Sequence, residues 1–288
     1  MKKKKRIAFQ GCRGAYSESA AYYLFGEDIE VVPMNTFEEI YQGIETLSVD
    51  GGAIPIENST AGSIYENYDL LYKWRHPIIS EVLLQIEHCL CGNNGASIHS
   101  LKRVLSHPQG LAQCSNFFSA HPGIEKVAFY DTAGSAEEVS KRDNITDGAI
   151  ASTYAAKLYG LSILKTNLEN IKGVNFTRFY GIQKNPVGIP YNAEIKSAIL
   201  FELANDGQAG SLYGALGAFA KREINLTRIE SRPHPDKPWG YIFHISFIGS
   251  PESPKVIEAL EELTRYTTFI YRLGSFAVGK TERLKYED

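Results

Sequence analysis

The sequence lacks the features that would assign it to several large classes of protein. Among its 288 residues no apolar run is long enough to cross a membrane, and the basic residues 2–6 precede only three apolar residues, too few for a signal peptide. The four cysteines include one close pair, Cys89 and Cys91, and this spacing without a second pair does not suit a metal site. We therefore expect a cytoplasmic protein without a metal, in which these two thiols are buried on one face of a strand.

Charge and glycine patterns exclude two further classes. A formal net charge of -3 argues against nucleic acid as a partner. After the first apolar strand the chain reads Gly11-Cys12-Arg13-Gly14, which is not the glycine pattern of dinucleotide-binding proteins, and no P-loop lysine pattern is present. We therefore expect no cofactor. The hydrophobic fraction of 43% is that of a globular protein, and the length predicts two domains.

The first two-thirds of the chain repeats one pattern, in which a short apolar strand leads through small or polar residues into a helix. The strands are residues 7–9, 52–56, 103–105, 127–130 and 148–151. This alternation predicts an α/β fold with largely parallel strands. Ligands bind beyond the carboxyl ends of such strands, where helix N-termini present free N–H groups. A small anion would suit that place, although the same hydroxyl and carboxylate residues also serve simply as helix caps.

The composition changes after about residue 184. Residues 185–195 contain asparagine, proline and glycine, which predict a linker. The elements expected beyond it follow the order β-α-β-β-α-β, which is a ferredoxin-like unit.

Residues 175–179, Asn-Phe-Thr-Arg-Phe, combine a carboxamide, a hydroxyl and a fixed cation with aromatic rings. This mixture would suit a small anionic substrate with an apolar ring. An amphipathic strand with a surface threonine and arginine would have the same composition, and the segment alone does not separate the two interpretations.

Several ordered motifs make the chain resemble the prephenate dehydratase family with a C-terminal ACT regulatory domain. They are residues 11–21, Pro55-Ile56-Glu57-Asn58-Ser59, Ser106-His107-Pro108-Gln109 with Gln113-Cys114, Tyr159-Gly160-Leu161, the segment 175–179, and residues 225–233 in the second domain. The resemblance implies a two-lobed catalytic domain, similar to periplasmic binding proteins, over residues 1–184. Its lobes would comprise about 5–84 plus 174–184, and 85–173. The linker 185–195, an ACT domain over 196–280 and a C-terminal tail over 281–288 would follow.

The family's reaction, decarboxylating dehydration of prephenate to phenylpyruvate in phenylalanine biosynthesis, is what the resemblance implies for this chain. Arogenate is an alternative substrate, and a non-catalytic sensor of amino acids or carboxylates is an alternative of another class. The family further implies phenylalanine as an allosteric effector, and a homodimer or homotetramer in the cytoplasm.

By resemblance, Thr177 is the catalytic residue, and we expect it to act through a positioned hydrogen bond to the leaving hydroxyl, because threonine is a very weak acid. The expected substrate-binding residues are Asn58, Ser59, Thr60, Ser106, Gln113, Thr132, Ala133, Asn175, Phe176, Arg178 and Phe179. Strand alternation leaves open whether Arg178 contacts substrate or faces away, and the two phenylalanines could belong to the core. His107 is either a rival general acid or a structural residue of its turn.

The expected phenylalanine site of the ACT domain lies at an interface between two such domains. It comprises Gly210, Ser211, Leu212, Asn225, Leu226, Thr227, Glu230, Ser231, Arg232 and Pro233. Ser211 is expected to cap a helix whose free N–H groups hold the effector carboxylate. Without the resemblance, Glu230 and Arg232 would be read as mutual surface partners.

Overall fold

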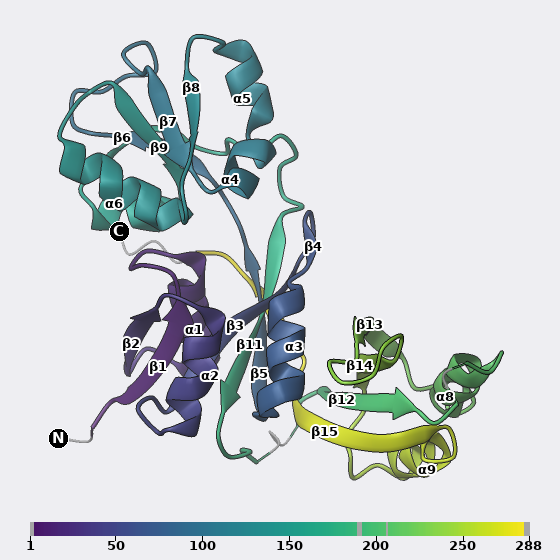
Figure 1. Cartoon of the computed structure of the whole chain (residues 1–288). Coiled ribbons are helices and arrows are strands. Elements are labelled where there is room, and N and C mark those ends of the chain that lie inside the picture. Colours follow the sequence, from purple (N-terminus) through teal and green to yellow (C-terminus); the bar gives the residue numbers. More distant parts are fainter. Residues whose placement is uncertain (1–2, 189–191, 206, 285–288) are drawn as a thin grey trace. The chain divides into compact units, whose positions relative to one another are not determined.

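The computed structural model describes residues 3–188, 192–205 and 207–284 (Figure 1). Part of the predicted linker, residues 189–191, and the last residues of the predicted tail, 285–288, lie outside the described residues. Contacts divide the chain into two compact units. The first unit comprises residues 1–64, 82–179 and 280–288, and the second unit comprises residues 65–81 and 180–279.

The first unit contains a sheet in the order β16-β5-β11-β3-β1-β2, with the short β4 paired to β3. Its strands are β1 (Lys5–Gln10), β2 (Ile29–Met34), β3 (Gly51–Asn58), β4 (Gly62–Ser63), β5 (Ile78–Gln85), β11 (Phe176–Gln183) and β16 (Lys280–Glu282). The boundary between the units falls within β5 and β11. β1 is parallel to both β2 and β3, as the alternation of strands and helices predicts. The helices that connect these strands are α1 (Tyr16–Phe25) and α2 (Phe37–Glu45).

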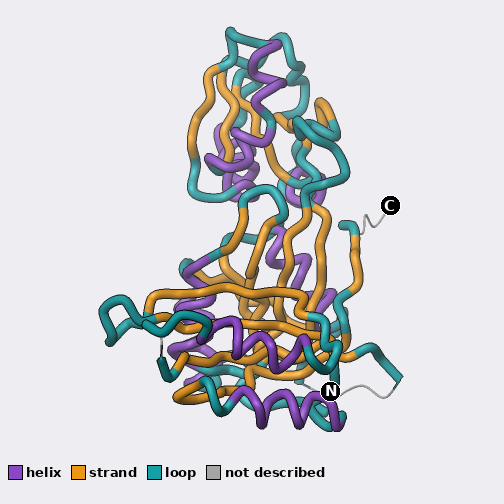
Figure 2. The backbone as a smooth tube through the Cα atoms, turned by 90° about the vertical axis from the view of Figure 1, so that its right-hand side faces the viewer, coloured by secondary structure: helices purple, strands orange, loops and turns teal. Residues whose placement is uncertain are grey.

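A second sheet of the first unit has the order β10-β6-β9-β7-β8. Its strands are β6 (Cys89–Gly92), β7 (Arg103–Ser106), β8 (Glu125–Ala128), β9 (Asp147–Ala151) and β10 (Ser162–Lys165). Its helices are α4 (Pro108–Gln113), α5 (Ser115–Ala120), α6 (Thr132–Arg142) and α7 (Thr153–Leu158). Alternate strand residues enter two buried clusters, one with α6 and α7 and the other with α4 and α5, so that helices cover both faces. Two connecting segments join this sheet to the first one, from β5 to β6 and from β10 back to β11 (Figures 1 and 2).

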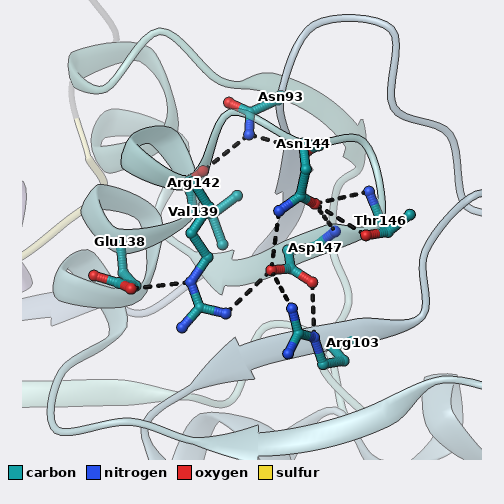
Figure 3. Close-up of polar contacts among 8 residues, drawn as sticks. All are labelled: Asn93, Arg103, Glu138, Val139, Arg142, Asn144, Thr146 and Asp147. Atoms are coloured by element: carbon teal, nitrogen blue, oxygen red, sulfur yellow. Dashed lines mark hydrogen bonds and ion pairs between the residues drawn. The ribbon is translucent and has the colours of Figure 1, made fainter.

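Asp147, at the start of β9, is fully buried and forms an ionic cluster with two arginines in the first unit (Figure 3). Arg103 binds both of its oxygens, at 2.9 and 2.8 Å, and Arg142 binds one at 3.1 Å. Burial opposes the ionisation of this carboxyl, but the hydrogen bonds from the two arginines outweigh burial and hold the pKa of Asp147 below its ordinary value. The cluster therefore holds β7, β9 and the end of α6 together as ionised partners.

The second unit contains an antiparallel sheet in the order β13-β14-β12-β15. Its elements are α3 (Tyr65–Trp74), β12 (Ile195–Leu203), α8 (Ser211–Ala220), β13 (Leu226–Pro233), β14 (Tyr241–Ile248), α9 (Pro254–Leu263) and β15 (Thr267–Ala277). One face forms a core with α8 and α9. α3 also packs against the sheet: Tyr68 meets His244 edge-on at 5.0 Å between ring centroids, and Arg232 binds both oxygens of Asp69 at 2.8 Å.

The predicted fold class is confirmed: an α/β part is followed by the β-α-β-β-α-β order of a ferredoxin-like unit. Cys89 and Cys91 are free and buried, as expected. The single helix expected after the strand 103–105 is two helices, because Cys114 leaves helical geometry at φ -111° and ψ 22° and separates α4 from α5. The first residues of the predicted tail belong to β16, which pairs with β5. By contacts, residues 65–81 group with the C-terminal part, since α3 packs against β13.

Candidate active site

A cavity of about 180 Å³ lies in the first unit, where β3 and β7 end. It is lined by Tyr16, Pro55, Asn58, Ile64, Ile86, His88, His107, Gln109, Gly110, Gln113, Thr132 and Thr177. Hydroxyl, carboxamide and imidazole groups from both sheets of the unit thus converge on one small space beside a few apolar side chains. Such a combination is typical of a site that fixes the orientation of a small ligand.

A larger cavity, of about 520 Å³, lies within the second unit. It is lined by Asp69, Leu70, Tyr72, Lys73, Arg232, Pro233, Pro235, Asp236 and Ile242. Its described lining contains no serine, threonine, asparagine or glutamine, and two of its charged groups are already paired with each other. Size therefore does not select the candidate active site; the convergence of polar groups does.

Thr177 is the second residue of β11, and its side chain is only 8% exposed. Asn58 donates a hydrogen bond from Nδ2 to the hydroxyl oxygen of Thr177 at 2.9 Å. Because neighbours on a strand face opposite sides, Arg178 does not line the cavity, and its Nε instead lies 3.3 Å from a carboxylate oxygen of Glu57. This resolves the alternative left open for Arg178 in favour of the side away from the cavity.

The carboxamide of Asn58 has only one orientation that fits its surroundings. Its Oδ1 lies 3.0 Å from the backbone nitrogens of both Thr60 and Ala61, and 2.7 Å from the hydroxyl of Thr60. Backbone N–H groups can only donate, so the atom that meets them must be the oxygen. The Nδ2 of Asn58 must therefore face Thr177, as a donor.

The orientation of the Asn58 carboxamide determines the orientations of the neighbouring side chains. The same Nδ2 of Asn58 donates to Oδ1 of Asn175 at 2.8 Å, and Nδ2 of Asn175 donates to Oε1 of Gln113 at 3.2 Å. Nε2 of Gln113 donates to the hydroxyl of Thr60 at 2.8 Å, and Thr60 donates to Asn58. The four side chains form a closed ring, which we call the carboxamide ring, and Gln113 on α4 brings the second sheet's side of the unit into it.

His88 extends the ring. Its Nε2 lies 2.9 Å from Oε1 of Gln113, which is an acceptor, so Nε2 carries the hydrogen. Burial lowers the pKa of His88, which keeps the imidazole neutral near pH 7. The other ring nitrogen, Nδ1, lies 3.3 Å from the hydroxyl of Tyr16, which donates to the carbonyl of Glu87 at 2.6 Å.

The network has a chemical consequence for Thr177. Its oxygen accepts a hydrogen bond from Asn58, and no described residue accepts the hydrogen of its own hydroxyl. That hydrogen is available to a ligand in the cavity. Thr177 is thus arranged as a hydrogen-bond donor whose oxygen is held in place by a neutral partner.

Two turns of the second sheet follow the helix-capping alternative that the sequence left open. At α6, Asp131 accepts the N–H groups of Ala133 and Gly134 at 2.6 and 3.4 Å. At α4, Nδ1 of His107 accepts the N–H of Gln109 at 3.2 Å. These donors therefore already have protein acceptors, and the side chains around them supply most of the hydrogen bonds that remain for a ligand.

The loop after β1 approaches the start of α6 very closely. Gly11 adopts φ +107°, and a Cβ atom there would lie 2.4 Å from Oδ2 of Asp131. Only glycine accommodates both the backbone angle and this approach. Burial raises the pKa of Asp131, although the N–H groups that it accepts oppose that rise.

The sequence expectations converge on the cavity only in part. Of the expected substrate-binding residues and Thr177, the structure places four on the cavity wall: Asn58, Gln113, Thr132 and Thr177. Thr60 and Asn175 lie behind them in the carboxamide ring. His107 lines the cavity and caps α4, so the structure gives it both a site position and a structural role.

Five other expected residues have structural partners elsewhere. Ser59 hydrogen-bonds the backbone of residues 174 and 176 and thereby joins the end of β3 to β11. Ser106 is fully buried and donates to the carbonyl of Ile150, because it lies within β7 rather than beyond its end. Phe179 belongs to the buried cluster around Ala20 and Leu84. Ala133 gives its N–H to Asp131, and Phe176 does not line the cavity.

Sequence reasoning missed His88 and Tyr16 as parts of the site. The only local signal was a histidine directly before the apolar strand that contains Cys89 and Cys91. The role of His88 depends on Gln113 and Tyr16, which are 25 and 72 residues away in the chain, and no local pattern reports such contacts.

The expected effector residues lie in the second unit. Gly210, at φ +87°, is the residue before α8, while the hydroxyl of Ser211 donates to the carbonyl of Asn205 and does not cap the helix. Arg232 pairs with Asp69 rather than with Glu230, because the two belong to facing elements, β13 and α3. The other expected effector residues are Leu212 on α8, Asn225 just before β13, and Leu226, Thr227, Ser231 and Pro233 on β13.

Comparisons with known proteins match both parts of the chain. A family model of prephenate dehydratases matches residues 7–187, and a model of ACT domains matches residues 199–265. The chain is 41% identical over 286 residues to arogenate dehydratase/prephenate dehydratase 2 of Arabidopsis thaliana, a match that covers 96% of this chain and 74% of that protein.

Two solved structures are similar along nearly the whole chain. Prephenate dehydratase from Arthrobacter aurescens, in complex with L-Phe, superposes with a TM-score of 0.86 at 27% identity, covering 96% of this chain and 91% of that one. GqqA, described as a novel type of quorum quenching acylase, also superposes with a TM-score of 0.86, at 32% identity over 96% of this chain and 98% of that one.

Proposed function

This chain belongs to the prephenate dehydratase family, and we propose that the cavity around Thr177 is where it carries out the family's reaction. The chain is an enzyme, a carbon–oxygen lyase. It converts prephenate to phenylpyruvate, carbon dioxide and water in phenylalanine biosynthesis. The observation that carries the assignment of the site is the hydrogen bond from Asn58 to Thr177, which leaves the threonine hydroxyl as a donor to the cavity.

The reaction requires little covalent chemistry from the protein. The ring carboxylate leaves as carbon dioxide, and its bonding electrons enter the ring as the carbon–oxygen bond to the ring hydroxyl breaks. The departing hydroxide takes up a proton and becomes water. Formation of the aromatic ring drives the process, so the site needs to orient prephenate and stabilise the departing oxygen.

Thr177 supplies that stabilisation as a hydrogen-bond donor. As negative charge develops on the departing oxygen, the hydrogen bond from Thr177 strengthens, whereas in the bound substrate it meets a neutral hydroxyl. Asn58 keeps the oxygen of Thr177 occupied and so fixes the direction of its hydrogen. His107, on the cavity wall, is the second group able to deliver a proton.

We propose prephenate as the preferred substrate because the family model that matches the chain is that of prephenate dehydratases. The described residues that line the cavity include no aspartate or glutamate and no lysine or arginine, so the charge of the lining does not distinguish prephenate from arogenate. The Arabidopsis relative carries both names, and a comparison of kcat/KM for the two substrates tests the preference.

Thr177 is not arranged as the nucleophile of an acylase, the activity described for the similar structure GqqA. Hydrolytic acyl transfer needs a nucleophile whose proton is taken by an adjacent base. The one described hydrogen bond of the Thr177 hydroxyl comes from Asn58, which donates to it and cannot act as that base.

Turnover of prephenate, followed by the absorbance of phenylpyruvate in base, tests the proposal. We expect Thr177→Ala to lower kcat by about 10²–10⁴-fold, and Thr177→Ser to retain more activity because it keeps the hydroxyl. Thr264→Ala, which removes an exposed hydroxyl in the second unit, is the matched control and should leave kcat unchanged. Wild-type turnover by Thr177→Ala would remove Thr177 from the mechanism.

We further propose feedback inhibition by phenylalanine at the ACT domain, in a homodimer or homotetramer. The Arthrobacter structure is a complex with L-Phe, and the ACT match here includes the expected residues of β13. Turnover that is unaffected by saturating phenylalanine, with binding verified by calorimetry, would contradict the feedback. Sedimentation with and without phenylalanine would test the oligomer.

We also propose a cytoplasmic location. None of the helices described in the structure is long and apolar enough to cross a membrane, and all four cysteines are free thiols. Fractionation of the producing cell tests this, and recovery in an organelle, as the chloroplastic relative would suggest, would overturn it.

A further inference from the structure

We propose that His88 is a positioning residue for the reaction, an inference that rests on the proposed function of the cavity. It acts by fixing the carboxamide of Gln113 and, through it, the carboxamide ring beside Thr177. Nε2 of the imidazole is bound to Gln113, and Nδ1 lies 3.3 Å from the hydroxyl of Tyr16, whose own hydrogen is donated to the carbonyl of Glu87.

The hydrogen of His88 is assigned by a chain of donors that begins at the backbone. The N–H groups of Thr60 and Ala61 fix the oxygen of Asn58. Each later carboxamide must then present an oxygen to the nitrogen before it, because the reverse would place two donors against each other. At the end of this chain, Oε1 of Gln113 faces His88 and requires a hydrogen on Nε2.

His88 is itself held from several sides. Its backbone N–H donates to the carboxylate of Glu169, and its carbonyl accepts from Leu168 at 3.1 Å. Its ring meets Tyr16 edge-on at 6.0 Å between centroids. His88 is only 3% exposed, so the surrounding residues hold its side chain in one position.

The position of His88 explains why a histidine is useful there. It follows β5 in the segment that leads to the second sheet, and Asn175 precedes β11 in the segment that returns. The N–H of Ile86 donates to the carbonyl of Asn175 at 2.8 Å, so the two segments are bonded to each other. Gln113 reaches this junction from α4 and receives two hydrogen bonds on one oxygen, from His88 and from Asn175.

Because Oε1 of Gln113 accepts two hydrogen bonds, the carboxamide is held in an orientation that directs its nitrogen at Thr60. Without His88, Gln113 retains one of these donors, and its carboxamide gains freedom to rotate away from the ring. The loss of order should appear in kcat, because the ring is needed when charge develops at Thr177, and only weakly in KM.

The first test requires no variant. Nitrogen chemical shifts of ¹⁵N-histidine-labelled wild-type protein should show His88 neutral, with its hydrogen on Nε2, from neutral pH down to well below the ordinary pKa of histidine. An Nε2 without a hydrogen at neutral pH could not donate to Gln113 and would overturn the proposal whether or not prephenate is the substrate.

The second test is kinetic. We expect His88→Leu to lower kcat for prephenate by about 5- to 10-fold, the loss expected for one neutral hydrogen bond. His88→Gln should recover most of it, since its amide nitrogen can occupy the place of Nε2. His99→Leu, which changes an exposed histidine, is the control and should leave kcat unchanged.

A double-mutant cycle separates positioning from a general structural role. In a Gln113→Ala background the acceptor is gone, so His88→Leu should then cost less than about twofold. An equal cost in both backgrounds would overturn the proposal. Inactivity of wild type towards prephenate, with the expected tautomer still present, would instead count against the proposed function.

Discussion

Two polar clusters of the first unit lie at opposite ends of β7 and are built from different chemistry. At the end beside His107, the carboxamide ring consists of neutral side chains whose hydrogen bonds have a defined direction. At the other end, Arg103 and Arg142 surround the fully buried carboxylate of Asp147. Both oxygens of a carboxylate accept and every guanidinium nitrogen donates, so an ion pair involves no choice between donor and acceptor atoms, whereas carboxamides specify which atom donates. The molecule uses direction where a hydroxyl must be aimed, and charge where elements must be joined.

Replacing one hydrogen-bond donor of the carboxamide ring with an acceptor should disrupt the ring and lower activity. Asn58→Asp places an oxygen 2.8 Å from Oδ1 of Asn175 and turns the hydrogen of Thr177 towards itself. We expect kcat for prephenate to fall about 100-fold. Asn94→Asp, a change of the same kind at an exposed position, should leave it unaltered. Normal turnover by Asn58→Asp would show that the direction of this hydrogen bond does not matter.

A substitution in the ionic cluster around Asp147 should lower stability and leave kcat nearly unchanged. Asp147→Asn should lower the free energy of unfolding by about 2 kcal/mol, since it leaves two arginines without their carboxylate, although both retain access to solvent. The kcat of the folded variant should stay within about twofold of wild type. Denaturant unfolding followed by circular dichroism, with kinetics on the same sample, checks both parts. A large loss of kcat without a loss of unfolding free energy would contradict a structural role for this cluster.

The pH dependence of that stability follows from the lowered pKa of Asp147. A carboxyl whose folded pKa lies below its unfolded value stabilises the protein above the unfolded pKa, about 3.9, and loses this contribution as pH falls through the folded value. The difference in unfolding free energy between wild type and Asp147→Asn should therefore be full at neutral pH and shrink below about pH 4.

His244 in the second unit offers a third kind of buried polar group, one with neither charge nor a hydrogen bond. Both of its ring nitrogens lack a partner among the described residues, and burial, with smaller effects from Arg228 and Arg232, lowers its pKa to about 3. Because the unfolded chain takes up this proton near pH 6.5, stability should fall as pH decreases below that value, by up to about 1.4 kcal/mol per pH unit.

His244→Phe should remove this slope. Both tryptophans, at positions 74 and 239, belong to the second unit, so tryptophan fluorescence reports its unfolding. Identical slopes for wild type and variant between pH 6 and 4 would contradict the neutral, buried state of His244.

The smallest expected effect concerns the pair between Arg232 and Asp69, which joins β13 of the proposed effector site to α3. α3 begins at the residue after Ile64, which lines the cavity. Asp69→Asn should leave kcat unchanged and shift the phenylalanine concentration for half-inhibition by up to about fivefold, the range of a partly exposed pair. Asp236→Asn, in the same second-unit cavity, is the control. An equal shift in both variants would show that the pair between Arg232 and Asp69 has no specific role in inhibition by phenylalanine.

The sequence predicted most where chemistry is local. Regular apolar spacing predicted the β-α-β-β-α-β order, and family motifs predicted Thr177, Asn58 and Gln113, which the structure brings to one cavity. It failed where a side chain has to choose between partners. Whether Arg178 meets a ligand or Glu57 depends on which face of β11 it occupies.

Some differences concern local features. The sequence left open whether the turn residues cap helices or leave N–H groups to a ligand, and at α6 Asp131 accepts two of these N–H groups. β2 and α2 were not predicted, although Thr36 caps α2 through a local hydrogen bond. Other features depend on long-range contacts. The grouping of α3 with the second unit arises from contacts more than 160 residues apart, such as Asp69 with Arg232.

The most direct test of the central claim is the kcat of Thr177→Val relative to Thr177→Ser, with prephenate as substrate. Valine keeps the shape of threonine and lacks the hydroxyl, whereas serine keeps the hydroxyl and lacks the methyl group. If Thr177 acts as a hydrogen-bond donor held by Asn58, Thr177→Val should lose about 10²–10⁴-fold and Thr177→Ser much less. Equal activity of the two variants would contradict the account.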